Sequence, residues 1–188
     1  ALVTSPDNTH ADIACELLTS GIPVYLEKPL AIDLDDATRI LTTAYETGTK
    51  LYVGHNMRHM SVVRGMRDII RRGLIGEVKA IWCRHFVGNG GDYCFKDWHA
   101  TREGVGGLLL QKAAHDLDVM HWLADSHTDR VTAMGALTLY DKVADRRDRT
   151  GELMSDWFSH DNWPPLAQTG LNPVIDVEDI SMMLMRMT

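Results

Sequence analysis

Short apolar runs alternate with amphipathic stretches over the first part of the chain. The runs lie at residues 2–5, 24–26 and 51–53. Between them, apolar side chains recur at helical spacing up to Gly21 and from Leu34 to Gly48. Short strands separated by helices of about a dozen residues are typical of right-handed βαβ units. We therefore expect a parallel sheet here.

Typical end residues mark the two expected helices. Asp33 should cap the second helix and Gly48 should end it. The first helix has three possible caps, Asp7, Asn8 and Thr9. On the second helix one apolar stripe is predicted at Leu34, Ala37, Ile40, Leu41 and Ala44.

The pattern changes after Arg58, so a second unit is expected to begin near residue 56. Its predicted elements are a helix at 61–72, a strand at 77–87, a glycine-rich loop at 88–107, a helix at 109–124, and strands at 131–140 and 175–187. Long strands with few helices between them favour an antiparallel or mixed sheet.

The stretch from Asp141 to Pro173 has little periodicity and is longer than ordinary connections between elements. It carries Trp157, Trp163 and the pair Pro164-Pro165. We expect an insertion that covers a site or an interface.

Both ends of the chain lie inside apolar runs. The chain opens on Ala1-Leu2-Val3 without a methionine and closes inside the run from Ile180 to Met187. Because a cut inside a strand exposes unpaired backbone edges, we expect a fragment of a longer protein.

Composition limits the classes of partner. Apolar residues make up 45% and charged residues 24% of the 188 residues, as in soluble globular proteins. The formal net charge of −7 argues against nucleic-acid binding, which needs a clustered Lys/Arg surface. No apolar stretch reaches the roughly 20 residues that span a bilayer, so no membrane partner is expected. Three cysteines without CxxC spacing favour reduced thiols and a cytoplasmic location.

Polar side chains follow the three predicted strands of the parallel sheet. They occupy residues 4–10, 27–29 and 54–58. Ligands of open parallel sheets bind outside the carboxyl ends of the strands, and these groups share that edge. Polar loops are also common at strand ends, but the coincidence of all three indicates a ligand site.

Several motifs then give the chain a recognisable pattern: Thr4-Ser5-Pro6 with His10, Gly21 to Leu30 with Glu27-Lys28-Pro29, Gly54-His55-Asn56-Met57-Arg58, Gly73-Leu74-Ile75-Gly76, Gly106-Gly107, and His115-Asp116-Leu117-Asp118. In this order they resemble the Gfo/Idh/MocA oxidoreductase family from residue 3 to about residue 123. The Glu-Lys-Pro element together with the later Gly-Gly and His-x-x-Asp element is the specific part.

The resemblance implies an α/β fold. Residues 1–55 would be the C-terminal part of a Rossmann doubly wound parallel sheet. Residues 56–188 would be an α+β domain with an open, mostly antiparallel sheet, incomplete at its C-terminus. It also implies NAD or NADP as cofactor, a carbohydrate or polyol substrate, and a homo-oligomer formed through the second sheet. The family's glycine-rich phosphate loop is expected before Ala1, because the run from Gly104 to Gly107 comes too late and lacks the spacing.

Lys28 is the leading catalytic candidate. It follows a buried strand, and desolvation of its stem would lower the lysine pKa. A neutral or proton-sharing lysine can hold a substrate hydroxyl while hydride leaves the adjacent carbon. Glu27 is expected to contact the cofactor or orient the lysine, and Pro29 restricts Lys28 to extended geometry. An exposed strand-end lysine is the alternative, against which the family pattern weighs.

His115 is the second catalytic candidate, since the corresponding histidine of the family is an acid/base or a substrate ligand. On one helix Gln111, Lys112 and Asp118 could all approach its face. Many members have Asp where this chain has Gln111, and Lys112 is expected to place a cation near a substrate oxygen or carboxylate. The expected substrate-binding residues are Gln111, Lys112 and Arg58. A packed core histidine is the alternative.

The resemblance also implies a set of cofactor contacts: Thr4, Asn8, His10, Glu27, Lys28, Asn56 and Trp98. Trp98-His99 stands where members often have Trp-Arg, so an aromatic wall is kept while the guanidinium is replaced. No metal site is predicted, because His55 and His59 stand four apart without a third ligand.

The expected function is hydride transfer between NAD or NADP and a carbon of a sugar or polyol. Two alternatives stay open: an NAD-dependent glycosidase of the same family and a non-catalytic nicotinamide-binding regulator. Net NADH formation favours the first, cleavage without it the second, and cofactor binding without turnover the third.

Overall fold

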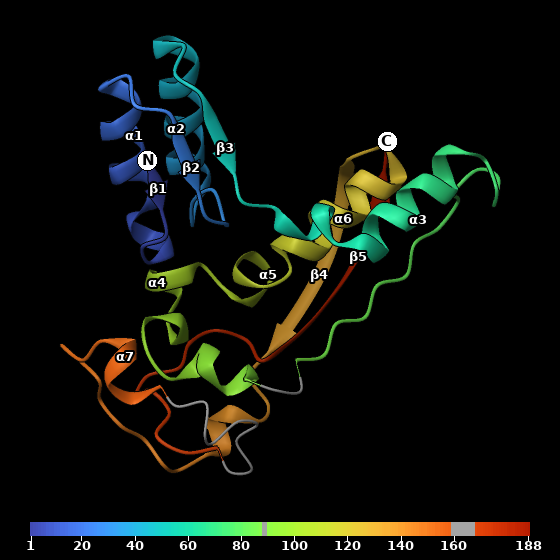
Figure 1. Cartoon of the computed structure of the whole chain (residues 1–188). Helices are drawn as coiled ribbons and strands as arrows, with labels where there is room; N and C mark the ends of the chain where they lie inside the picture. Colours follow the sequence, from blue (N-terminus) through green and yellow to red (C-terminus); the bar gives the residue numbers. More distant parts are fainter. Residues whose placement is uncertain (88–89, 159–167) are drawn as a thin grey trace.

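The computed structural model describes residues 1–87, 90–158 and 168–188. A small parallel sheet with two helices forms one unit, and a long antiparallel ribbon belongs to the other (Figure 1). No helix within the described ranges is long and apolar enough to cross a membrane. Trp163, Pro164 and Pro165, named above in the predicted insertion, lie outside these ranges.

The parallel sheet contains β1 (Leu2–Val3), β2 (Val24–Leu26) and β3 (Leu51–Val53) in that spatial order. α1 (His10–Thr19) connects β1 to β2, and α2 (Leu34–Thr47) connects β2 to β3, so the predicted βαβ units are present. Because the strands are parallel, their carboxyl ends meet at one edge of the sheet.

One face of the sheet carries the core of this unit. Val24 and Leu26 are buried, whereas Tyr25 between them is exposed, as the alternation of side chains along a strand requires. The buried residues beneath α1 and α2 are Val3, Ala11, Ala14, Leu18, Val24, Leu26, Ala31 and Ile40. On the opposite face Tyr25 stacks on Tyr52 with ring centroids 5.2 Å apart.

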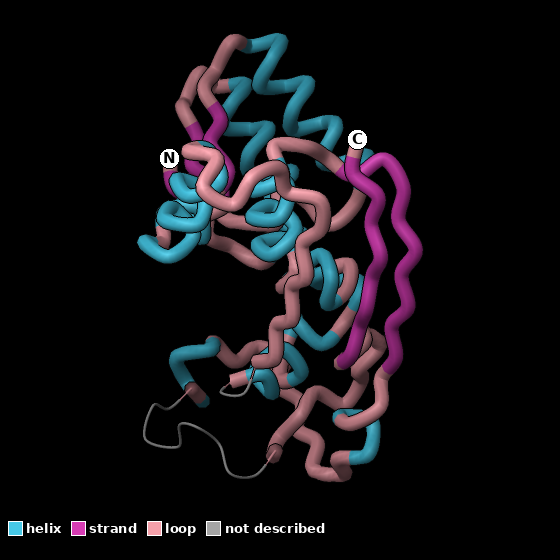
Figure 2. The backbone as a smooth tube through the Cα atoms, turned by 90° about the vertical axis from the view of Figure 1, so that its right-hand side faces the viewer, coloured by secondary structure: helices cyan, strands magenta, loops and turns pink. Residues whose placement is uncertain are grey.

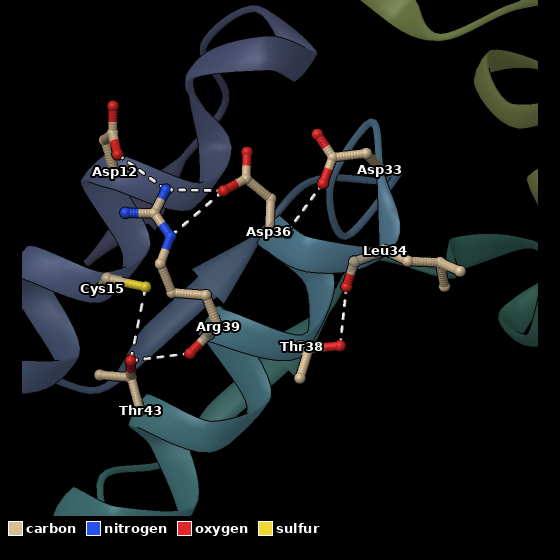
Figure 3. A network of polar contacts seen from close by, with 8 residues as sticks. All are labelled: Asp12, Cys15, Asp33, Leu34, Asp36, Thr38, Arg39 and Thr43. Atoms are coloured by element: carbon tan, nitrogen blue, oxygen red, sulfur yellow. Dashed lines mark hydrogen bonds and ion pairs between the residues drawn. The ribbon is translucent and has the colours of Figure 1, made fainter.

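The ends of α2 confirm the sequence prediction. The Asp33 carboxylate accepts a hydrogen bond from the Asp36 N–H at 2.8 Å, and Gly48 ends the helix at φ +64°. Figure 3 shows this cap beside Arg39, whose guanidinium binds both Asp36 and Asp12 of α1 at 2.8 Å. At α1 the N-cap position is Thr9, but its hydroxyl donates to the Pro6 carbonyl at 2.7 Å and no side chain caps the helix.

The predicted apolar stripe of α2 was too wide. Ile40 is fully buried, and Ala37 and Ala44 pack against the core. Leu34 and Leu41 are 83% and 54% exposed. At about 3.6 residues per turn these two side chains lie roughly 100° or more away from Ile40 around the helix, which turns them from both the sheet and α1.

After β3 the chain forms η2 (Asn56–His59), α3 (Ser61–Arg71), η3 (Gly91–Phe95), η4 (Trp98–Ala100), α4 (Arg102–Val105), α5 (Leu108–Gln111) and α6 (Ala114–Ala124). It continues with β4 (Thr128–Ala136), η5 (Tyr140–Lys142), α7 (Met154–Trp157) and β5 (Ile180–Met187). β4 and β5 pair antiparallel and lie side by side in Figure 2. The predicted helix at 61–72 is confirmed, and the two late strands are present with shifted bounds.

Two predicted elements of this unit were wrong. Residues 77–87 form no strand, because nothing in the described ranges pairs with their backbone. Instead Cys83 and His85 both reach the Asp116 carboxylate of α6, at 3.8 and 3.0 Å. The helix expected at 109–124 is broken at Lys112 into α5 and α6.

The predicted insertion packs against the segment that carries Trp98. Arg149 donates to the Lys96 carbonyl at 2.9 Å, and Leu171 is fully buried in a cluster with Phe95. The described parts of 141–173 therefore pack against η3 and η4. In the view of Figure 1, α7 of this stretch lies below the parallel sheet.

Candidate active site

Lys28 lies where the parallel sheet meets the second unit. Its strand ends on the fully buried Leu26, and the Lys28 side chain itself is half-buried. Its Nζ donates a hydrogen bond to the backbone carbonyl of Gln111 at 2.7 Å. In a continuous helix that carbonyl would accept from the His115 N–H, so the break between α5 and α6 makes it available to Lys28.

Close packing brings α4 and α5 up to the loop that follows Lys28. Gly106, at φ +74°, leaves no room for a side chain, because a Cβ there would lie 2.9 Å from the Ile32 carbonyl oxygen. Glycine at this point permits the backbone approach that sets Gln111 beside Lys28.

Glu27 fixes the backbone of the same loop. Its carboxylate accepts a hydrogen bond from the Lys28 N–H, and the Lys28–Pro29 peptide bond is cis. Gly54, at the end of β3, packs so closely that a Cβ there would lie 3.0 Å from Glu27 Oε2. The Glu27 carboxylate thus lies between the ends of β2 and β3.

The electrostatic surroundings of Lys28 depress its basicity. Burial lowers the pKa of the Lys28 ammonium, and the nearby Lys112 cation lowers it further. The carboxylates of Asp7 and Glu27 act in the opposite direction. This direction agrees with the prediction that desolvation lowers the pKa of Lys28.

His115 lies in the first turn of α6, close to Lys28. Burial lowers the pKa of its imidazole, and the Lys28 cation lowers it further. Its Nδ1 is buried and has no hydrogen-bond partner within the described residues. The ring meets His55 edge to face, with centroids 6.4 Å apart. The neutral imidazole is therefore the favoured form at neutral pH.

Four buried polar atoms around Lys28 lack hydrogen-bond partners among the described residues: Asp7 Oδ2, His55 Nδ1, Gln111 Oε1 and His115 Nδ1. Asp7 and Gln111 are only 5% and 7% exposed. An unpaired buried polar atom costs about 1–3 kcal/mol, so a cluster of them marks a place that a polar ligand can complete.

Two of these residues are absent from the predicted site residues. The sequence singles out Asp7 individually only as a possible helix cap and His55 only as half of an unsupported metal pair, although both belong to polar groups at the predicted ligand edge. Burial raises the pKa of the Asp7 carboxyl, while Lys28 and His10 lower it. Their membership in the polar groups 4–10 and 54–58 was the signal that could have identified them.

His10, a predicted cofactor contact, connects two loops at the sheet edge. His10 is fully buried, with Nδ1 2.8 Å from the Pro29 carbonyl and Nε2 3.1 Å from the Ser5 carbonyl. Because both ring nitrogens bind the protein, the ring of His10 is used within the fold, and its predicted contact with a cofactor, expected largely through backbone groups, stays a prediction. Its role is to join the loop after β1 to the loop after β2.

Arg58 forms an ion pair with α6, and its predicted part in substrate binding stays a prediction. Its Nε donates to Asp118 at 2.6 Å, and its guanidinium lies 5.7 Å from the centroid of the Trp122 ring. The ion pair attaches η2 to α6 and occupies the Asp118 carboxylate. The break at Lys112 separates Gln111 and Lys112 from the helix that carries His115, so the predicted common face remains only for His115 and Asp118, three residues apart on α6.

The remaining predicted cofactor contacts lie at the sheet edge and on η4. Thr4, Asn8 and Asn56 are exposed. Trp98 is half-buried and stacks on His99 with ring centroids 3.6 Å apart, while Asp97 binds the His99 ring. The described residues contain no cluster of three or more potential metal ligands.

Comparisons with known proteins extend this picture. A family model for the GFO/IDH/MocA C-terminal domain matches residues 63–188, and one for an oxidoreductase family with an NAD-binding Rossmann fold matches residues 1–55. The YteT protein of Bacillus subtilis (strain 168) is 30% identical over 141 residues, which are 74% of this chain and 33% of YteT. An inositol 2-dehydrogenase of Gluconacetobacter diazotrophicus is 32% identical over 125 residues, 66% of this chain and 34% of that protein.

Among solved structures, the aldose-aldose oxidoreductase from Caulobacter crescentus complexed with glycerol superposes with a TM-score of 0.71. It is 21% identical, and the match covers 99% of this chain and 46% of that one. This likeness concerns the fold. The chain spans about a third of the length of the two relatives named above.

Proposed function

Because the chain belongs to the Gfo/Idh/MocA oxidoreductase family, we propose that the protein transfers hydride between NAD or NADP and a carbon of a sugar or polyol. The observation that carries the proposal is the contact of Lys28 Nζ with the Gln111 carbonyl, which holds a half-buried ammonium near the unpartnered imidazole of His115. The similar inositol 2-dehydrogenase bears the name of a polyol oxidoreductase, which supports this substrate class.

The residues at the sheet edge suit a nicotinamide cofactor. Thr4, Asn8 and Asn56 present polar groups to solvent at the carboxyl ends of the strands, and Trp98 offers an aromatic wall. The unpartnered oxygen of Asp7 at the same edge is a further polar contact that a bound ligand would satisfy. When bound, the nicotinamide supplies the acceptor or donor of the hydride.

Lys28 and His115 have the properties needed to accept the proton of the substrate hydroxyl and to give it back. The Gln111 carbonyl fixes Lys28 Nζ in place, and the lowered pKa of the lysine makes the release of its proton easier. His115, kept neutral by burial, can accept the proton that leaves the hydroxyl as the carbon is oxidised. In reduction the same groups would return it.

We also propose a division of the chain at residue 55 and a homo-oligomer formed through β4 and β5. Their outward side chains Met134, Met182 and Leu184 are exposed and apolar, which supports a subunit contact there.

A cytoplasmic location agrees with three free cysteines, and the net charge of −7 supports small molecules rather than nucleic acid as partners.

The test is Lys28→Met in the natural full-length protein, with NAD(P)H formation followed by absorbance on a panel of sugars and polyols. We expect turnover to fall by about 10²–10⁴-fold, the usual size of general acid–base catalysis. The matched control is Lys79→Met, because Lys79 is an exposed lysine paired with Glu77 at 2.6 Å. Unchanged turnover in Lys28→Met would remove the assignment.

Product analysis separates the two alternatives in the same experiment. Glycoside cleavage without net NAD(P)H would identify the glycosidase. Cofactor binding without any turnover would identify the regulator.

A further inference from the structure

Lys112 is a half-buried cation without a counterion in the described part of the chain. Its ammonium has no hydrogen bond and no ion pair there. The acid one helical turn later, Asp116, is already bound by His85 at 3.0 Å and by the thiol of Cys83. A partly exposed ammonium with no carboxylate partner within the described residues is available to bind an anionic group of a ligand.

A second cation lies beside it. The Lys28 ammonium binds the carbonyl of Gln111, the residue that precedes Lys112, and Lys112 is the neighbouring charge that lowers the pKa of Lys28 most. The acids nearest Lys28 do not compensate Lys112. Glu27 binds the Lys28 N–H, and neither Glu27 nor Asp7 forms an ion pair with Lys112.

The group next to Lys112 is a hydrogen-bond acceptor that also lacks a partner. Gln111 Oε1 is buried and unpaired, and Gln111 is 7% exposed. A hydroxyl can donate to this oxygen, whereas a carboxylate cannot. The pair Gln111 and Lys112 therefore presents one acceptor for a hydroxyl and one cation for an anionic group.

We propose that Lys112 determines substrate specificity by binding a carboxylate, so that the protein acts on acidic sugars such as aldonates or uronates in preference to neutral ones. This inference rests on the proposed function and names the substrate class of the same site. A single ammonium matches the single charge of a carboxylate, and the hydroxyls of the same molecule match Gln111 Oε1. Sugar phosphates share the anionic chemistry and are distinguished by the test.

The test uses the natural full-length protein with NAD and with NADP. Catalytic efficiency (kcat/KM) is measured for D-gluconate, D-glucuronate, D-glucose, sorbitol and D-glucose 6-phosphate, in wild type, Lys112→Met, Lys112→Arg and the exposed-lysine control Lys79→Met. In wild type we expect the better acid to exceed the better neutral substrate by at least about 10-fold.

In Lys112→Met the ratio of acidic to neutral efficiency should fall by about 10- to 100-fold, the size of one charge-assisted hydrogen bond. The change should appear mainly in KM for the acids, and Lys112→Arg should keep most of the preference because it keeps the charge. A role confined to folding would lower the efficiency for acidic and neutral substrates alike.

Three results would overturn the inference: a wild-type preference for neutral substrates, a ratio unchanged by Lys112→Met, or a preference for the sugar phosphate. The first two leave the proposed function intact if NAD(P)H is formed. If no substrate supports turnover, the proposed function fails, and calorimetric binding of D-glucuronate in the presence of NADH decides the inference. Affinity at least about 10-fold weaker in Lys112→Met supports it, and equal affinity refutes it.

Discussion

Replacing Lys96 with methionine should strongly destabilise the protein, because it leaves a buried carboxylate without its counterion. Lys96 Nζ lies 2.6 Å from the Asp92 carboxylate, and the two side chains are 10% and 3% exposed. The same ammonium lies 4.7 Å from the centroid of the Tyr93 ring. Methionine keeps most of the volume of the lysine stem but leaves Asp92 with an uncompensated charge.

The cost follows from this burial. Removing one partner of a buried ion pair typically costs about 3–5 kcal/mol, a large share of the roughly 5–15 kcal/mol that stabilises a folded protein. With a urea dependence of about 2 kcal/mol per molar, the unfolding midpoint should fall by about 2 M. The double variant Lys96→Met with Asp92→Leu should recover at least about half of the loss, since an apolar pair needs no counterion.

Equilibrium urea unfolding of the natural full-length protein, followed by circular dichroism, measures both effects. Lys79→Met is the matched control, because both partners of the Lys79–Glu77 pair are about three-quarters exposed and such pairs contribute about 0–1 kcal/mol. A loss below about 1 kcal/mol in Lys96→Met would refute the reasoning, and so would a double variant less stable than the single one.

Two further predictions concern His115 and the glycines. In an NMR titration the pKa of His115 should lie below its ordinary 6.5 and should rise in Lys28→Met, because the neighbouring cation is removed. The unfolded chain binds this proton more readily than the folded chain does. The contribution of His115 to the free energy of unfolding is therefore complete above pH 6.5 and is lost as the pH falls below that value. His115→Gln should flatten this part of the dependence of stability on pH, measured by urea unfolding. Gly104→Ala should cost about 3 kcal/mol of unfolding free energy, because its Cβ would lie 2.1 Å from the Trp98 carbonyl oxygen. Gly65→Ala, in open space on α3, should instead add about 0.5–1 kcal/mol, and equal effects of the two substitutions would contradict this account.

Local signals identified the elements around Lys28. Asp33 and Gly48 mark the two ends of α2. Both could be predicted because a cap depends on residues within one turn of the helix end. The three polar groups of the parallel sheet share an edge because strand direction alone brings carboxyl ends together. Neither feature requires knowledge of distant contacts, so the sequence was enough to predict both.

Long-range contacts decided the features that local signals in the sequence did not show. The expected helix breaks at Lys112, next to the Gln111 carbonyl that accepts a hydrogen bond from Lys28. Lys28 lies 83 positions before Gln111. Arg58 pairs with Asp118 across 60 residues, and His10 uses both ring nitrogens on two loops. Residues 77–87 have the pattern of a strand but no strand of the described residues beside them, and a ladder needs two.

The apolar pattern predicted that Lys28 lies just past a buried strand of a parallel sheet, and the family motifs made it a catalytic candidate. Which groups face Lys28 depends on the packing of segments far apart in the chain. The Gln111 carbonyl, the neutral imidazole of His115 and the unpaired Asp7 come from segments whose approach depends on packing, as at Gly106. The physical reason is that periodicity and capping act over a few residues, whereas desolvation and charge depend on everything that folding brings within a few ångströms.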